Sequence, residues 1–90
     1  MDSDRKYKVA ESVHSQLVDG ELVILDMKTE KYFGLDSVGS DIWKLIDEEN
    51  SFQEILDAML EMYDADPDQV NRDIEDLIEK LLTDNLIEPV

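Results

Sequence analysis

Apolar residues in the first half of the chain recur with the short period of β-strands. The ELVIL run at 21–25 is rich in branched residues and too short to form a helix of its own. In the KYFGLD segment at 31–36, Phe33 and Leu35 fall on one face, and Tyr32 and Gly34 fall on the other. The pattern predicts two strands, joined by a turn at 28–30.

The dipeptide Asp19-Gly20 predicts a tight hairpin ahead of these strands. A two-residue type I′ turn needs positive φ at both central positions, which Asp and Gly tolerate. A strand before this turn would complete a three-stranded antiparallel sheet. The same segment also permits a helix, because Val9, Val13 and Leu17 are spaced four residues apart.

From residue 36 onwards the apolar spacing becomes helical, and the pattern predicts three helices in succession. Residues that cap helix N-termini precede each apolar segment. Ser51 and Glu54 have the spacing of a capping box, and Asp66 precedes a proline at the first helical position. For the first helix, either Asp36 or Ser37 is the expected cap.

Each predicted helix has one apolar face, and the third helix is expected to fray around Asn85. The faces are formed by Val38, Ile42, Leu45 and Ile46, with Trp43 at the margin; by Phe52, Ile55, Leu56, Met59, Leu60 and Tyr63; and by Val70, Ile74, Leu77, Ile78, Leu81 and Leu82. The predicted fold class is α+β, a winged helix-turn-helix-like domain in which a three-stranded antiparallel sheet is followed by three helices. We expect residues 1–8 to be a flexible N-terminus and residues 9–90 to form a single domain.

Composition excludes several kinds of site. The 90 residues suffice for one hydrophobic core, and the absence of cysteine excludes disulfides, thiol catalysis and thiolate metal sites. No apolar run approaches the ~20 residues of a membrane span, and the N-terminus lacks the apolar core of a signal peptide. We therefore expect a cytoplasmic protein without membrane association.

Negative charge dominates the chain. Twenty-four Asp and Glu against eight Lys and Arg give a net charge of −16. Nucleic acid is not an expected partner, because phosphate binding requires basic residues and the third helix offers only Arg72 and Lys80. The acidity is either a solvated surface or a field that attracts a basic partner.

The GLDSV segment at 34–38 permits a second interpretation of the chain. It resembles the site at which acyl or peptidyl carrier proteins receive phosphopantetheine, and Ser37 would be the modified residue. Carrier proteins resemble one another in placing a long helix and a loop ahead of this site, whereas the hairpin and strand patterns here predict a sheet. An Asp-Ser pair before a helix is also what capping alone would select.

Nearly the whole chain, from about Val13 to Ile87, resembles small PqqD-like proteins, the recognition elements of ribosomal peptide biosynthesis. As a free-standing acidic version it is most similar to the leader-binding protein of lasso peptide clusters, and it lacks the tryptophan-rich first-strand pattern of PqqD proper. The matching positions are Gly20, Tyr32, Phe33, Leu35, Gly39, Ile42, Trp43, Ser51, Glu54, Ile55, Leu86 and Ile87.

This resemblance implies that a leader peptide binds in a groove between the third strand and the third helix. An edge strand can pair with an extended peptide, and adjacent pockets can select its side chains. Family leaders place a tyrosine, a proline and a leucine in such an extended segment. The site residues expected on this basis are Lys31, Tyr32, Phe33, Gly34, Leu35, Val70, Asp73, Ile74, Asp76 and Leu77.

The resemblance also implies a leader peptidase and an ATP-dependent cyclase as partners of a non-enzymatic adaptor. The residues themselves offer little for catalysis, because His14 is the only histidine and no nucleophile, phosphate loop or metal-ligand cluster has interpretable spacing. We therefore expect no cofactor and no metal. The expected function is to present the precursor peptide to these enzymes.

Overall fold

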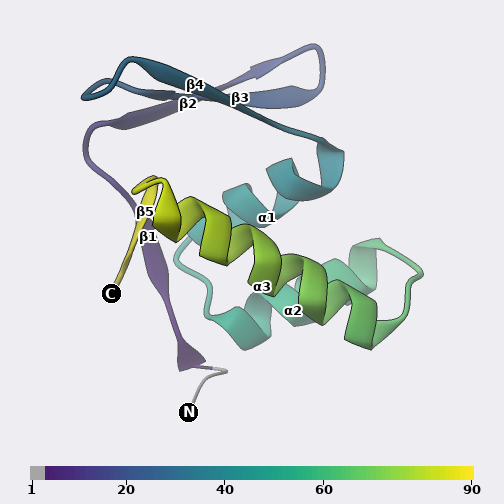
Figure 1. Ribbon diagram of the computed structural model, residues 1–90. Helices are drawn as coiled ribbons and strands as arrows, with labels where there is room; N and C mark the ends of the chain where they lie inside the picture. Colours follow the sequence, from purple (N-terminus) through teal and green to yellow (C-terminus); the bar gives the residue numbers. More distant parts are fainter. Residues whose placement is uncertain (1–3) are drawn as a thin grey trace.

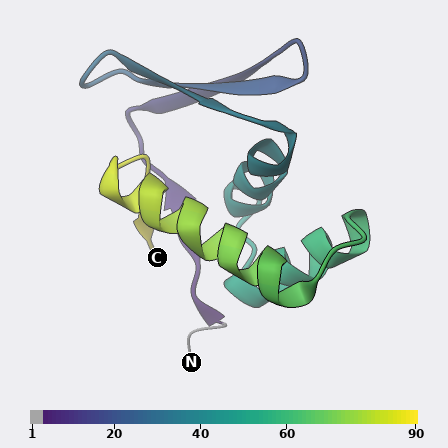
Figure 2. The ribbon, with the colours of Figure 1, turned by 45° about the vertical axis from the view of Figure 1, so that its right-hand side comes forward.

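The computed structural model describes residues 4–90 and contains two small sheets and three helices (Figure 1). The predicted α+β arrangement is confirmed: an antiparallel sheet of order β2-β3-β4 is followed by three helices, which lie on one side of it in Figures 1 and 2. The elements are β1 (Tyr7–Val9), β2 (Val13–Val18), β3 (Glu21–Asp26), β4 (Lys31–Leu35), α1 (Ser37–Asp47), α2 (Phe52–Met62), α3 (Pro67–Thr83) and β5 (Ile87–Pro89).

Two turns build the three-stranded sheet. Asp19 and Gly20 have φ values of 54° and 84°, as the predicted type I′ turn between β2 and β3 requires. The turn before β4 ends at Glu30, which has a φ of 61°. Val13 and Leu17 lie in β2, so the helical alternative for this segment is wrong.

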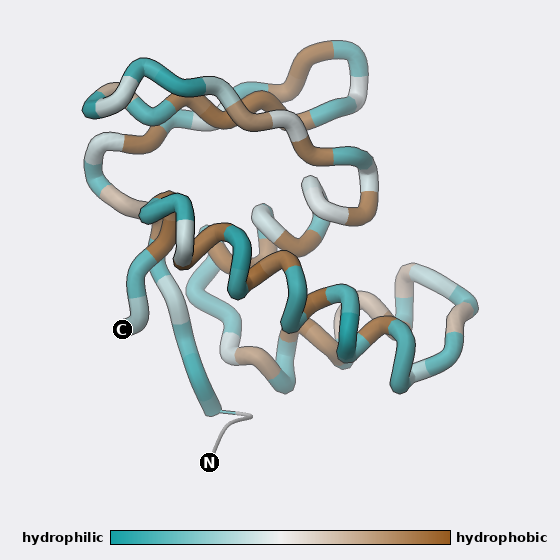
Figure 3. Tube along the Cα trace, viewed as in Figure 1, coloured by the Kyte–Doolittle hydropathy of each residue, from teal (hydrophilic) through white to brown (hydrophobic). Residues whose placement is uncertain are grey.

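The three predicted helix caps are present. Asp36, rather than Ser37, caps α1 and accepts a hydrogen bond from the Gly39 N–H at 2.8 Å. Ser51 and Glu54 form the predicted capping box of α2. Asp66 caps α3. In Figure 3, apolar and hydrophilic stretches alternate along these helices, as their amphipathic patterns predict.

Helix α1 buries a wider face than its spacing indicates. Trp43, expected at the margin, is only 2% exposed, and its indole N–H donates to the Ser15 hydroxyl at 3.3 Å. Leu45, expected on the apolar stripe, is only partly buried. The reason is that α1 contacts β1, β3 and β4 as well as α2, so it has neighbours on several sides.

The N-terminal segment is attached to the domain, contrary to the expectation of a flexible segment at 1–8. Residues 1–3 lie outside the described part of the chain, but Tyr7 and Lys8 belong to β1, which pairs antiparallel with β5. Tyr7 is 5% exposed. Arg5 lies 4.5 Å from the Phe52 ring centroid and forms an ion pair with Glu75, which fixes the segment against α2 and α3.

The C-terminal strand is a second feature that the apolar pattern did not predict. Helix α3 ends at Thr83, and Asn85 adopts a φ of 59°, near the expected fraying point. The chain then continues into β5 with Leu86 and Ile87 almost fully buried. The pairing of β1 with β5 joins the two ends of the described chain.

Replacing Asp36 with alanine is expected to lower the free energy of unfolding by about 0.5–2 kcal/mol, because the Gly39 N–H loses its acceptor. Ser37→Ala is the matched control and should change stability much less. Urea unfolding of both variants measures the difference. A larger loss of stability for Ser37→Ala than for the Asp36 variant would show that Ser37, and not Asp36, caps α1.

Candidate functional site

Strand β4 is an open edge of the three-stranded sheet. Among residues 4–90, the order β2-β3-β4 leaves its outer side without a neighbouring strand. A type I′ turn closes with a hydrogen bond between its first and last residues, here Val18 and Glu21. Since hydrogen-bonded and non-bonded pairs alternate along antiparallel strands, the backbone groups of Leu22 and Ile24 point toward β4.

The same alternation decides which backbone groups of β4 face outward. Leu35 and Phe33 are opposite Leu22 and Ile24, so their N–H and C=O groups point toward β3. The groups of Tyr32 and Gly34 therefore point away from the sheet. They form the free edge to which another strand can bond.

A groove lies between this edge and α3. Its volume is about 440 Å³. The floor comes from the first turns of α1, because the single residue Asp36 separates β4 from that helix. The lining residues are Gly34, Leu35, Asp36, Val38, Gly39, Ile42, Asp73 and Leu77.

A smaller apolar pocket continues the groove toward the start of α3. It has a volume of about 110 Å³ and shares Val38, Ile42 and Asp73 with the groove. Its other lining residues are Met59, Tyr63, Ala65, Val70 and Ile74. Groove and pocket together form one path along α3, with apolar walls and a carboxylate between them.

Six of the ten predicted site residues line this path, and four do not. Tyr32 is on β4 with its side chain 71% exposed, and Phe33 is partly buried against the core. Lys31 and Asp76 are exposed and line neither cavity. The six residues brought together are Gly34, Leu35, Val70, Asp73, Ile74 and Leu77.

Sequence reasoning missed the contribution of α1. Val38 and Ile42 were assigned to the core stripe alone, yet both also line the groove. A signal was available, because a helix that begins one residue after a strand must lie at the end of that strand. Gly39 makes this approach possible: a Cβ there would meet the Leu35 Cβ at 3.2 Å.

Tyr63 connects α2 to α1 at the small pocket. Its hydroxyl donates to an Asp41 carboxylate oxygen at 2.6 Å. This hydrogen bond is the main cause of a raised pKa for the Tyr63 phenol, because ionisation would remove the proton that Asp41 accepts. The contact holds the aromatic ring in the pocket wall.

The described residues 4–90 contain no group of three or more His, Cys, Asp or Glu side chains placed to hold a metal ion. His14 is exposed on β2, at the opposite edge of the sheet from the groove. In the same range, no helix has both the length and the apolar character needed to cross a membrane.

Residues 21–87 match the family described as coenzyme PQQ synthesis protein D (PqqD). The match covers more than half of the chain, which therefore belongs to the PqqD family. The resemblance to PqqD-like recognition elements is confirmed. The carrier-protein alternative at Ser37 is wrong, because a sheet precedes this residue and the family is a different one.

Two solved structures resemble the chain closely. One is described as TbiB1 in complex with the TbiA(beta) leader peptide: it is 41% identical, has a TM-score of 0.85, and the alignment covers 90% of this chain and 94% of that one. The other is lasso peptide synthetase B1 complexed with the leader peptide, at 18% identity, a TM-score of 0.86 and coverage of 93% and 99%, and it shows the common fold. No curated protein sequence matches.

The two apolar residues of α3 nearest the groove should differ in their effect on stability. Ile74 is fully buried, so Ile74→Ala is expected to lower the free energy of unfolding by about 2–5 kcal/mol. Leu77 is only partly buried, and Leu77→Ala should cost clearly less. Urea unfolding compares them. Equal losses would mean that Leu77 is a core residue and unsuitable for testing the groove.

Proposed function

We propose that the chain binds the leader segment of a ribosomally made precursor peptide as an added strand on β4. It then presents the precursor to a separate leader peptidase and an ATP-dependent cyclase and catalyses no step itself. The pathway is lasso peptide biosynthesis, and the location is the cytoplasm. The observation that carries this proposal is the free edge of β4, with the outward backbone groups of Tyr32 and Gly34 beside an apolar groove. The 41% identity to leader-bound TbiB1 supports it.

Gly34 supports the same proposal. A Cβ at this position would meet no atom of residues 4–90 within 4 Å, and the φ of Gly34 is not in the positive range that favours glycine. The free protein therefore has no visible need for glycine here, although glycine inside a strand costs about 0.5–1 kcal/mol relative to alanine. A close approach by another backbone at this edge accounts for it.

The walls of the groove select the side chains of the leader. Leu77 and Val38 are only partly buried in the free protein, so an apolar leader side chain can complete their burial. Asp73 is exposed between the groove and the small pocket, where it can accept a hydrogen bond from a leader donor. The net charge of −16 favours a basic leader.

Titration with the leader encoded beside this gene should produce the largest backbone amide shifts at residues 31–36 and 70–77. The added strand bonds directly to the first range, and its side chains contact the second. Two-dimensional NMR of the labelled protein measures them, and the TbiA(beta) leader serves as a second probe. Shifts that instead gather on the outer side of α2, at residues 53–61, would refute strand addition.

Gly34→Pro should weaken leader binding on the order of tenfold or more. The substitution removes one outward N–H, a bond worth about 0.5–1.5 kcal/mol, and places a ring where the added strand lies. Edge strands accept proline when this N–H faces solvent, so the free protein should stay folded.

Gly34→Ala keeps the N–H and adds only a Cβ, so it should weaken binding less than the proline variant and thereby separates the loss of the donor from the loss of the close approach. Glu61→Ala, on the exposed side of α2, controls for a general loss of affinity and should be nearly neutral. Calorimetry compares the three variants, with circular dichroism as the check of folding. A proline variant that binds as tightly as the unmodified protein would exclude backbone pairing at Gly34.

A further inference from the structure

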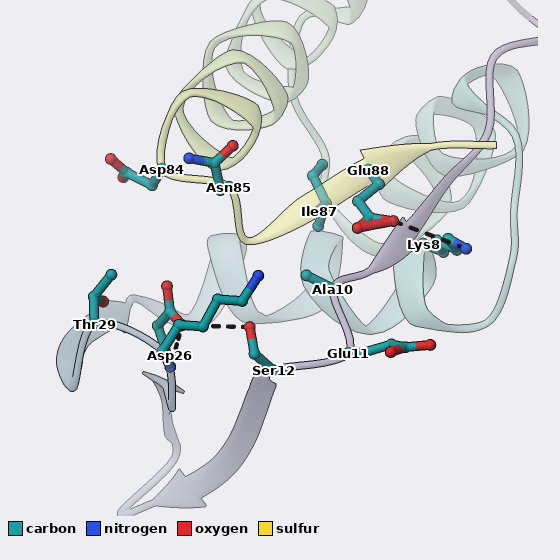
Figure 4. A pocket seen from close by; sticks show the side chains of 11 residues that line it. Lys8, Ala10, Glu11, Ser12, Asp26, Thr29, Asp84, Asn85, Ile87 and Glu88 are labelled. Atoms are coloured by element: carbon teal, nitrogen blue, oxygen red, sulfur yellow. Dashed lines mark hydrogen bonds and ion pairs between the residues drawn. The ribbon is translucent and has the colours of Figure 1, made fainter.

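A third cavity lies at the Lys31 end of β4, away from the groove. It is the largest of the cavities described, with a volume of about 760 Å³, and we call it the Asp26 pocket. Figure 4 shows Asp26 and Ser12 facing Asp84 and Asn85 across it. The lining residues are Lys8, Ala10, Glu11, Ser12, Asp26, Lys28, Thr29, Asp84, Asn85, Ile87 and Glu88.

Asp26 is a buried carboxylate with incomplete partners. It is 5% exposed, and it accepts a hydrogen bond from the Lys28 backbone N–H at 3.0 Å and a long one from the Ser12 hydroxyl at 3.4 Å. Both bonds go to Oδ1, and no hydrogen bond or ion pair within residues 4–90 involves Oδ2. No fully buried side-chain oxygen or nitrogen in residues 4–90 lacks a hydrogen-bond partner, so Oδ2 is open to the water of the pocket. This oxygen belongs to a carboxylate without a cationic partner, and a cationic donor brought by a ligand can replace that water with a charge-assisted hydrogen bond.

The other charged residues of the pocket do not cancel the preference of Asp26 for a cation. The Lys8 ammonium pairs with Glu88 at 3.8 Å. The Lys28 side chain forms no ion pair in the described part of the chain. Glu11 and Asp84 add two more carboxylates to the lining, so acidic groups outnumber basic ones by four to two. Coulombic attraction therefore favours a positively charged group.

The position of the pocket relates it to the groove. Asp26 is the register partner of Lys31, the first residue of β4, whereas the groove contacts the other end of that strand at Leu35. Helix α3 runs from the groove towards the pocket, in the direction opposite to β4. Its residue Leu77 lines the groove, and its C-cap Asp84 lines the pocket. A peptide paired antiparallel to β4 would enter at Leu35 and leave at Lys31, with its C-terminal continuation at the pocket.

We propose that the Asp26 pocket binds a cationic side chain, arginine or lysine, of the precursor segment that follows the paired strand. This inference rests on the proposed function and on antiparallel pairing. The buried Asp26 carboxylate accepts the ammonium or guanidinium hydrogen bonds through its unpaired oxygen. The pocket thereby sets where the paired leader ends and the onward chain begins.

The first experiment locates the ends of the bound leader. A nitroxide label is attached in turn to the C-terminal and the N-terminal end of the synthetic leader encoded beside this gene, and NMR follows the broadening of the protein amides. The C-terminal label should broaden Lys28, Thr29 and Asn85 most strongly, and the N-terminal label should broaden Val38 and Ala65. Broadening in the reverse order, or none at the pocket, would overturn the proposal.

The second experiment tests the charge preference. A series of leaders carries one arginine, or glutamine in its place, at successive positions after the paired strand. At the position that reaches the pocket, arginine should improve affinity about tenfold over glutamine in the unmodified protein. Asp26→Asn keeps an oxygen that can accept from the Lys28 N–H but removes the charge, and it should abolish the advantage of arginine.

Asp57→Asn, on exposed α2, is the control with the same change of net charge, and it should keep the advantage. If Asp26→Asn does not fold, the nitroxide experiment on the unmodified protein still decides. An advantage of arginine that is absent at every position, or equally lost in the control, would refute the cation site. If the cation site is refuted but the leader still shifts the amide signals of residues 31–36, strand addition on β4 remains supported. If the leader does not shift these amide signals, the proposed function itself is refuted.

Discussion

The close contact between the end of β4 and the first turn of α1 is the constraint on which the rest of the structure depends. Only Asp36 separates the two elements, and it caps the helix through the Gly39 N–H. A side chain at Gly39 would meet Leu35, so glycine permits the approach. The Ser40 hydroxyl then bonds to the Leu22 N–H at 3.2 Å and to the Leu35 carbonyl at 3.3 Å, which links helix and sheet. This junction forms the floor of the groove.

The position of α3 gives the groove its second wall. The helix packs against α2 and β5, while α1 makes the helical contacts with β3 and β4. The N-terminal segment reinforces this arrangement, because β1 pairs with β5 and Arg5 pairs with Glu75 of α3. Helix α3 is thus held from the side away from β4. Its Leu77 remains partly buried at the groove instead of closing it.

Charge has opposing effects on the stability of the fold and on the encounter with a ligand. Within residues 4–90, Arg5 forms an ion pair with Glu75 and Lys8 forms one with Glu88, so basic residues of the N-terminal segment help to attach it to α3 and β5. Most carboxylates of the described residues 4–90 remain without a basic partner, in a chain of net charge −16. Uncompensated charge destabilises a compact fold by repulsion, and it also speeds the encounter with a basic ligand. The lining of the groove itself is mostly apolar.

Local sequence signals determined the hairpin turn, the capping box at Ser51 and the succession of three helices. Each depends on residues close together in the chain, such as the positive φ that Asp19-Gly20 accommodates. Only the tertiary structure decided that Asp36, and not Ser37, caps α1 and that Trp43 is buried. It also paired the two chain ends as β1 and β5.

The candidate site, too, has features that the sequence predicts and features that only the tertiary structure decides. The alternation in KYFGL and the stripe on α3 were visible in the sequence, and six of the ten expected residues do line one path. Which backbone groups of β4 face outward could not be deduced locally. The single residue between β4 and α1 indicated that the helix lies at the end of the strand, but it did not show which side chains of α1 line the groove. Strand order and helix packing depend on contacts between residues far apart in the chain, and these form only when the whole core assembles. The sequence by itself therefore determined β3, β4 and the three helices, and the tertiary structure added β1 and β5 and decided which surfaces remain open.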